Sequence, residues 1–593
     1  MKQNRMPRPD SETASLDQND QSNEGQLTQS LTHSRRAFIG TVAAGIAALP
    51  TALTSTAEAT TQSFEPEAAT TGKKRAKQAQ NLRIDAANTQ RAVPIPDHPT
   101  NGDEARYPTK IGNYSKGLKH DPNTGEVDPA AYDALIAAIT NGSNADFDSI
   151  VTRGLVGCPD PVRRRRQVNP QSAYAFDLEG TDSHQLAMRA APAFASAEEA
   201  GEMVELYWMS LLRDVNFLNY ESNPIAQRAC TDLSRLSDFR GPKIGGQVTP
   251  QTLFRDKFPG CTDGPYISQF LLQPCAFGSQ EVDQRITTTA PDEAFGSSFS
   301  EWIDIQNGFQ PLQTLTPADK VFCRNGRDIG AYVHVDVLYQ AYFVAFLVIA
   351  GGGYPVDPGN PYGTALDPGS GRPLVTGASG SISQIGFGTF GGPAIATLVT
   401  EPSTRALKGQ WFQKWMVHRR LRPEEFGGRV EVQRLGRRTY PFHADLANSS
   451  VLGEVFSEFG SHLLPLAFPE GSPLHTSYGS GHATVAGGAV TMLKAFFDES
   501  AVIKNPVVPS DDGQSVVPYQ GTPLTVGGEL NKIASNVAQG RNIAGVHWRT
   551  DATEALKLGE DIAISILKDT KGCYNEAFSG FTLTRFDGTT ITV

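Results

Sequence analysis

The sequence contains few cysteines and no closely paired cysteine motif. Its 593 residues include six of them: Cys158, Cys230, Cys261, Cys275, Cys323 and Cys573. The absence of Cys-x-x-Cys argues against a thiolate zinc site or a dithiol redox motif. In an oxidising compartment some of the six would pair, but the sequence does not choose among the possible connectivities.

The sequence also lacks an excess of basic residues. Its 52 Lys and Arg residues are outnumbered by 63 Asp and Glu, giving a net charge of −11. This balance argues against a general nucleic-acid-binding role. The one basic cluster, Arg-Arg-Arg-Arg at 163–166, is expected to form surface ion pairs or a subunit contact rather than to bind a polyanion.

A long apolar run is missing as well. The apolar stretch within Ser34–Ala59 is short and rich in alanine, so we expect no membrane span. It follows the pair Arg35 and Arg36 and ends in Ala-Glu-Ala at Ala59, a pattern typical of a twin-arginine export signal. The alternative is an amphipathic or disordered leader. Export by this route predicts a bacterial protein delivered folded to the periplasm or beyond.

What the sequence does contain is mostly helical periodicity, with no internal repeat. The pattern predicts helices at 196–218, 330–353, 393–420, 480–497, 528–541 and 551–568. Asp336 and Gln340 interrupt the second of these, which we interpret as a core helix with His334 as a satisfied core histidine. A β excursion at 515–526 and a hairpin around Asp587-Gly588 complete a mainly α fold class with small β additions.

The segment 351–392 is rich in Gly, Pro, Asp and Ser and is expected to be a long loop. Asp357, Asn360 and Asp367 could bind calcium there. Their spacing matches no EF-hand, so ordinary turn chemistry is the favoured interpretation.

Three short blocks carry the candidate chemistry, and the first is KWMVHRRLRPEEF at 414–426. Lys414 lies near a helix end, and a proline directly follows Arg422. Because the residue before proline avoids helical geometry, the chain turns there and the lysine and arginine can converge on one point. Arg419 and Arg420 are expected to form salt bridges.

The second block, HTSYGSGHA at 475–483, lies where an apolar helix begins. A helix start presents unpaired N–H groups and the positive end of the helix dipole, so it attracts anions. Ser480 and Gly481 could contact such an anion, and His482 beside it could move protons. The plain alternative is an N-cap serine with an adjacent histidine.

The third block, GRNIAGVHWRTDATEA, occupies 540–555. Arg541 ends one helix and His547 follows six residues later. Asp551 lies four residues after the histidine, where its carboxylate could bind one ring nitrogen and leave the other free. Glu554 is a less favoured partner for the ring.

Together the blocks supply three fixed positive charges, a helix start and histidines, with no carboxylate cage for a divalent metal. The expected guest is a small tetrahedral oxyanion, which suits the paired donors of arginine. A neutral His547 nitrogen could bond the central atom, with His482 as acid and base on an opposite oxygen.

This set resembles the superfamily of vanadium-dependent haloperoxidases and type 2 phosphatidic acid phosphatases, whose pattern is K-x6-R-P, P-S-G-H and S-R-x5-H-x3-D. The chain departs from it by one extra residue before Arg422, by Gly479 for proline and by Gly540 for serine. The extra residue, and His475 seven before His482, are most similar to the red-algal and cyanobacterial bromoperoxidases. The motifs cover about 410–555, and the broader similarity covers most of 100–590.

The resemblance implies a role for each matched residue. Vanadate would be bonded through His547 and hydrogen-bonded by Lys414, Arg422, Arg541, Ser480 and Gly481. His482 would bind the apical oxygen and assist proton transfer from peroxide, Lys414 would polarise the peroxide, and His475 would bear on halide preference. Gln413 is a further candidate for tuning the halide environment.

The resemblance further implies a vanadate-dependent haloperoxidase that oxidises bromide, iodide and in some members chloride with hydrogen peroxide. The hypohalous acid formed would halogenate small organic acceptors. The implied fold is two helical bundles in a homo-oligomer, with the algal dodecamer as the precedent. The predicted divisions are a leader and signal at 1–59, an extended arm or linker at 60–110, an N-terminal helical region at 111–390 and a vanadate-binding bundle at 391–593.

Two other functions stay open at this point. A phosphatase or phosphoryl-transfer enzyme would use the same pocket with His547 as nucleophile, although His475 and the large N-terminal region weigh against it. A secreted, non-catalytic oxyanion-binding protein would need no proton-carrying histidine, so His482 weighs against that function.

Overall fold

The computed structural model describes residues 72–150, 152–153, 165–363, 365–366, 373–374 and 383–593. The chain divides into two compact units, with the boundary after Asn81. The described part of the first unit is the beginning of helix α3 (Gly72–Ala92). The sequence predicted an extended arm here, but Ala, Lys, Arg and Gln dominate this stretch and all favour helix. The predicted export signal, Cys158 and Asp367 lie outside the described residues.

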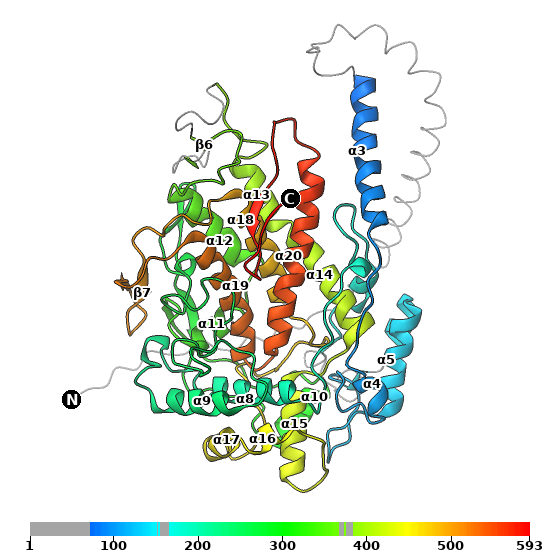
Figure 1. Ribbon diagram of the computed structural model, residues 1–593. Helices are drawn as coiled ribbons and strands as arrows, with labels where there is room; N and C mark the ends of the chain where they lie inside the picture. The colour runs from blue at the N-terminus through cyan, green and yellow to red at the C-terminus, as the bar shows by residue number, and fades with distance from the viewer. Residues whose placement is uncertain (1–71, 151, 154–164, 364, 367–372, 375–382) are drawn as a thin grey trace, which may run out of the picture. The chain divides into compact units, whose positions relative to one another are not determined.

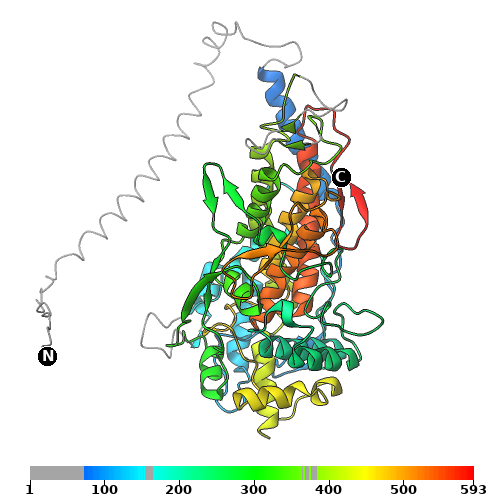
Figure 2. The same cartoon turned by 90° about the vertical axis from the view of Figure 1, so that its left-hand side faces the viewer.

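Three long helices form the centre of the second unit: α18 (Gly481–Phe496), α19 (Val526–Ile543) and α20 (Arg549–Lys571). They pack against one another, and α13 (Gly392–Thr400) and α14 (Pro402–Phe412) pack on α18 (Figures 1 and 2). Glycine permits the close crossing of α18 and α20, because a Cβ at Gly487 would collide with the Leu556 carbonyl. The two helix starts that bear on the site are thereby held together.

A second group of helices centres on α8 (Ala197–Leu211), which is buried along most of its length. It packs against α9 (Pro224–Arg235), α15 (Pro423–Arg434), α16 (Ala444–Ala447) and α17 (Val451–Phe459) (Figure 1). Four of its buried residues are glutamates: Glu198, Glu199, Glu202 and Glu205. Buried carboxylates require partners, and here these are arginines from other elements.

The predicted helix at 330–353 is two helices, α11 (Gly326–Tyr332) and α12 (Gln340–Gly351). The intervening residues turn because their polar side chains bond to groups outside the helix. His334 is stacked on Phe468 and lies 2.7 Å from a carboxylate oxygen of Glu470, so it is satisfied, but it is partly exposed rather than in the core. Asp336 faces His482.

The remaining helical segments are short. They are α4 (Asp103–Arg106), α5 (Pro129–Asn141), α6 (Asn144–Ser149), α10 (Phe299–Gln306), a π-helix (Gln413–His418) and 3-10 turns at Pro170–Tyr174, Ser183–Gln185, Phe217–Asn219 and Gln269–Leu271.

The described strands form five two-stranded antiparallel sheets. The pairs are β1 (Cys275–Phe277) with β2 (Gln280–Val282), β3 (Ile286–Thr289) with β4 (Pro317–Val321), β5 (Ala365–Leu366) with β6 (Pro373–Leu374), β7 (Val507–Pro509) with β8 (Val516–Pro518), and β9 (Thr582–Thr584) with β10 (Thr590–Thr592). The C-terminal hairpin is as predicted, and the β excursion begins earlier than expected. The mainly helical fold class is confirmed.

Within the described residues, no helix is both long enough and apolar enough to cross a membrane. The five described cysteines are unpaired, four of them buried. Asp357 and Asn360 lie in a turn, where the Asp357 side chain accepts a hydrogen bond from Gly359 N. Calcium binding there stays a prediction.

Candidate oxyanion-binding site

Helix α18 begins at the predicted anion site. Ser480 is its N-cap, and its hydroxyl accepts a hydrogen bond from the Ala483 N–H. Gly481 is the first helical residue, so its own N–H has no intrahelical acceptor. A Cβ at Gly481 would lie 3.2 Å from Leu407 and Trp411 side-chain atoms, and glycine therefore keeps this helix start open.

Lys414 and Arg422 converge because the helix between them changes its winding. Residues Gln413–His418 form a π-helix and Arg419 is left-handed, with φ 42°. A π turn holds more residues than an α turn, which accommodates the extra residue noted in this block. Lys414 Nζ then donates to the carbonyls of Thr476 and Ser477, at 2.7 and 2.9 Å.

Arg422 connects the other two blocks, and its backbone is extended as the following proline requires. Its Nε donates to the His475 carbonyl at 2.9 Å, and Nη2 lies 2.9 Å from His475 Nδ1. Its Nη1 donates to the Val546 carbonyl and lies 3.0 Å from His547 Nε2.

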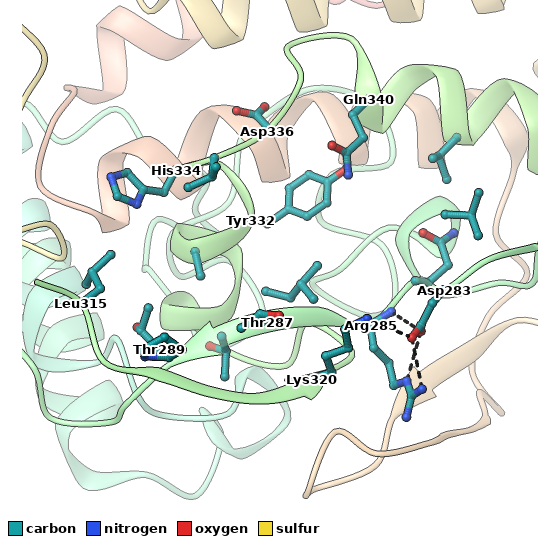
Figure 3. A pocket seen from close by; sticks show the side chains of 18 residues that line it. Asp283, Arg285, Thr287, Thr289, Leu315, Lys320, Tyr332, His334, Asp336 and Gln340 are labelled. Carbon is teal, nitrogen blue, oxygen red and sulfur yellow. Dashed lines mark hydrogen bonds and ion pairs between the residues drawn. The ribbon is translucent and has the colours of Figure 1, made fainter. Parts of the chain in front are cut away.

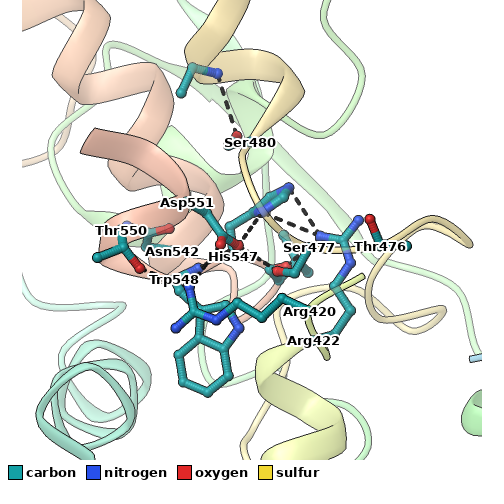
Figure 4. A network of polar contacts seen from close by, with 12 residues as sticks. Arg420, Arg422, Thr476, Ser477, Ser480, Asn542, His547, Trp548, Thr550 and Asp551 are labelled. Atoms are coloured by element: carbon teal, nitrogen blue, oxygen red, sulfur yellow. Dashed lines mark hydrogen bonds and ion pairs between the residues drawn. The ribbon is translucent and has the colours of Figure 1, made fainter. Parts of the chain in front are cut away.

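His547 lies in the turn between α19 and α20, where Gly545 has φ 81°. Its Nδ1 is 2.8 Å from Asp551 Oδ2, and its Nε2 faces the Arg422 guanidinium (Figure 4). A carboxylate accepts and a guanidinium only donates. The proton is therefore on Nδ1, and Nε2 is the unprotonated nitrogen, whose lone pair accepts from Arg422. Glu554 instead pairs with Arg189 and Lys557.

Arg541 and His482 approach the same place from α19 and α18. Arg541 donates from Nη1 to the Val333 carbonyl at 2.8 Å, while its buried Nε has no partner among the described residues. His482 Nε2 lies 3.0 Å from Asp336 Oδ1. Sequence analysis missed Asp336 as part of the site, although a carboxylate inside an apolar stretch was a signal that it had a partner.

One cavity of about 290 Å³ collects most of these groups. Its lining includes His475, Gly481, His482, Arg541 and His547, and also the polar residues Asn169 and Ser172. Its apolar lining is Val168, Leu338, Leu407, Trp411 and Pro473. Lys414, Arg422 and Ser480 lie directly behind this lining, through the contacts given above. Gln413 does not line the cavity, and its side chain donates to the Leu186 carbonyl.

The site holds more positive charge than its neighbours neutralise. Lys414, Arg422 and Arg541 are all buried, and their hydrogen bonds go to backbone carbonyls and imidazoles. Among the described residues none of the three forms an ion pair with a carboxylate, in contrast to Arg420 and Arg549.

The pKa values of the site respond to this charge. Burial and the neighbouring Arg422 lower the pKa of Lys414 well below its usual range. Burial lowers the pKa of Arg541 to about 10. Burial, then Arg422 and Lys414, lower the pKa values of His475 and His547 well below 6.5, so both rings are neutral at pH 7. Burial lowers the pKa of His482 as well, although Asp336 opposes the shift.

A larger cavity, of about 500 Å³, includes Asp336 in its lining (Figure 3). Its basic residues Arg285 and Lys320 both approach Asp283, at 3.1 and 3.8 Å, and Asp336 adds a second carboxylate to the lining. The smaller cavity, whose cations have no carboxylate partner among the described residues, is therefore the better candidate for an oxyanion site.

Comparison with known proteins gives consistent matches. A family model described as the VCPO second helical-bundle domain matches residues 447–576. Vanadium-dependent bromoperoxidases of Corallina pilulifera and Ascophyllum nodosum are 35% and 34% identical, covering 88% and 77% of this chain and 98% and 81% of theirs. The homohexameric structure of the second vanadate-dependent bromoperoxidase from Ascophyllum nodosum matches with a TM-score of 0.79 and 30% identity, covering 88% of this chain and 90% of that one.

Proposed function

Because the chain belongs to the family of vanadium-dependent bromoperoxidases, we propose that it binds vanadate and oxidises bromide with hydrogen peroxide to hypobromous acid. Iodide, which is easier to oxidise, is a further substrate, and chloride is the demanding one. Small organic acceptors are halogenated by the hypohalous acid that forms.

The observation that carries this proposal is the trio of buried cations without carboxylate partners among the described residues. Isolated buried charges are costly, so Lys414, Arg422 and Arg541 fit a site whose counter-charge is a bound oxyanion. Arg541 Nε, which has no partner in the described part of the chain, and the open helix start at Gly481 add donors to the same cavity. This donor set fits vanadate, which carries its negative charge on several oxygens.

The side chains and backbone groups of the cavity would have separate roles in binding vanadate. His547 Nε2 would bond the vanadium in place of its contact with Arg422, because it is the unprotonated ring nitrogen and Nδ1 donates to Asp551. Lys414, Arg422, Arg541, the Ser480 hydroxyl and the Gly481 N–H would hold the oxygens. When bound, vanadate supplies a Lewis acid that activates hydrogen peroxide toward attack by halide.

Proton movement falls to His482. Its ring lines the cavity and is neutral at pH 7, so it can accept a proton released when peroxide binds. Asp336 orients the ring through Nε2 and stabilises its charged form. His475, between Arg422 and Trp411, adjoins the space that halide would enter.

The direct test is bromination of a phenolic dye by peroxide with and without added vanadate. We expect activity that requires vanadate, and phosphate should inhibit it by competing for the same donors. His547→Ala should abolish bromination, because it removes the ligand to vanadium, while His443→Ala, at a histidine outside the cavity, should not. Substantial bromination by His547→Ala would refute the assigned ligand. Nitrophenyl phosphate hydrolysis without bromination would favour the phosphatase alternative.

Assembly and export are parts of the same proposal. A relative forms a homohexamer, which supports a homo-oligomer for this chain, and light scattering distinguishes a hexamer from a dodecamer. Export through the twin-arginine signal predicts that replacing Arg35 and Arg36 by lysine retains the protein in the cytoplasm of a bacterial host.

A further inference from the structure

Arg420 lies where the three sequence blocks meet, and it does not line the cavity. Its Nη1 donates to Asp551 Oδ1 and Thr550 Oγ1, at 2.9 and 2.8 Å. Its Nη2 donates to Glu199 and Glu202 on α8. This arginine is paired with carboxylates, whereas Lys414 and Arg422 have no carboxylate partner within the described ranges.

Asp551, which accepts from Arg420, also contacts two parts of the site, the His547 ring and the loop that leads into α18. Its Oδ2 accepts from His547 Nδ1 at 2.8 Å and from the Ser477 hydroxyl (Figure 4). Its backbone carbonyl accepts from Ser480 N at 2.8 Å. Arg420 adds a contact of its own, because its carbonyl accepts from Ser477 N at 3.1 Å. One carboxylate therefore links the His547 ring to the loop that leads into α18.

The guanidinium of Arg420 is oriented by aromatic rings as well as by its ion pairs. It lies over the Trp548 ring, 4.6 Å from the centroid, and 5.8 Å from that of Tyr478. A planar fork stacked in this way directs separate donors to Asp551 and to α8, which a lysine ammonium cannot do.

We propose that Arg420 is a positioning residue for the vanadium ligand: through Asp551 it holds the His547 ring so that Nδ1 donates to Asp551 and Nε2 is the nitrogen left to bond the vanadium. Without Arg420, Asp551 Oδ1 would lose its charged partner, and the carboxylate could rotate so that Oδ2 no longer accepts from His547 Nδ1. The ring would then no longer be held in one orientation relative to the cavity. This inference rests on the proposed vanadate function.

The test compares vanadate and phosphate binding to the full-length protein by calorimetry. Both anions use the donors of the cavity, but only vanadate also needs a coordinate bond from Nε2. Arg420→Lys should weaken vanadate binding by about 10- to 100-fold, as is typical when the partner of a metal-bound histidine is changed. Phosphate binding should change much less, and the vanadate-to-phosphate preference should fall.

Arg549→Lys is the matched control. Arg549 is also buried and pairs with α8, with its Nε 2.7 Å from Glu205, but it has no bond to the Asp551 side chain. Its variant should keep the wild-type preference. Equal loss of both anions in Arg420→Lys, the same loss of preference in Arg549→Lys, or no loss at all would overturn the proposal.

A second variant tests the proposal even if Arg420→Lys does not fold. Asp551→Asn places an amide, which can donate, beside His547 Nδ1, and it should lower the vanadate-to-phosphate preference in the same way. An unchanged preference in a folded Asp551→Asn protein would also overturn the proposal. If the wild-type protein itself bound no vanadate, the proposed function would fail instead.

Discussion

At the scale of single residues, the site is built from buried cationic side chains that lack, in the described part of the chain, the carboxylate partners usual for buried charges. Lys414, Arg422 and Arg541 lack carboxylates among the described residues, whereas Arg420 and Arg549 nearby are paired with them. The first three are therefore candidates for binding an anion, whereas the last two form ion pairs within the fold. Residue type and spacing predicted that the first three would meet, and that Asp551 would bind one ring nitrogen of His547. They did not identify His482, 146 positions away, as the partner of Asp336, because Asp336 lies outside the three blocks, although a carboxylate inside an apolar stretch indicated that it had a partner.

Asp336→Asn tests the pairing with His482. Asp336 acts to raise the pKa of His482, which burial lowers. Removing the charge should lower the pKa of His482 further, so the neutral ring that accepts the proton would be present at a lower pH. The acidic limb of the bromination profile should therefore move to lower pH. We expect kcat to fall by about 10- to 100-fold. The pH dependence of kcat measures this, and an unshifted profile would contradict the assignment. Asp283→Asn, in the neighbouring cavity, is the control.

At the scale of elements, the site depends on where helices begin and on how closely they cross. The periodic spacing of hydrophobic residues and the proline after Arg422 predicted most of the helices that carry the three blocks. The π-helix at Gln413–His418 was not predicted, because α and π winding share the same local residues and differ in tertiary packing. The division between α11 and α12 was missed for a similar reason, since His334 and Asp336 take partners from distant segments.

Gly487→Ala tests the crossing of α18 and α20. A Cβ at Gly487 would collide with the Leu556 backbone, which cannot move without separating the helices. We expect a loss of stability of about 1–3 kcal/mol, as for other overpacked cores, together with weaker vanadate binding. Urea unfolding provides the measurement. Gly453→Ala, on α17 with open space where its Cβ would lie, should leave stability unchanged or raise it slightly. Equal stability of the two variants would argue against a glycine-dependent crossing.

At the scale of the whole molecule, the uncompensated charge makes stability depend on the bound anion. The cavity is lined by residues of α14, α18 and α19 and of further segments near Asn169, Leu338, His475 and His547. An oxyanion bound there would therefore also link these segments. Vanadate at 100 times its dissociation constant should stabilise the folded protein by about 2.7 kcal/mol. The melting temperature should therefore rise with vanadate and, at higher concentrations, with phosphate, but not with matched chloride.

Arg541→Met distinguishes this effect from a general influence of salt. The substitution removes a buried charge that has no carboxylate partner among the described residues, so the anion-free variant should melt at the same temperature as the wild type or higher. The increase caused by vanadate should shrink in the same variant, because one of the three cations that hold the anion is gone. Calorimetric melting of both proteins, with and without vanadate, measures the two effects together. A variant that is less stable without the anion but gains the full increase with it would mean that Arg541 supports the fold rather than the anion.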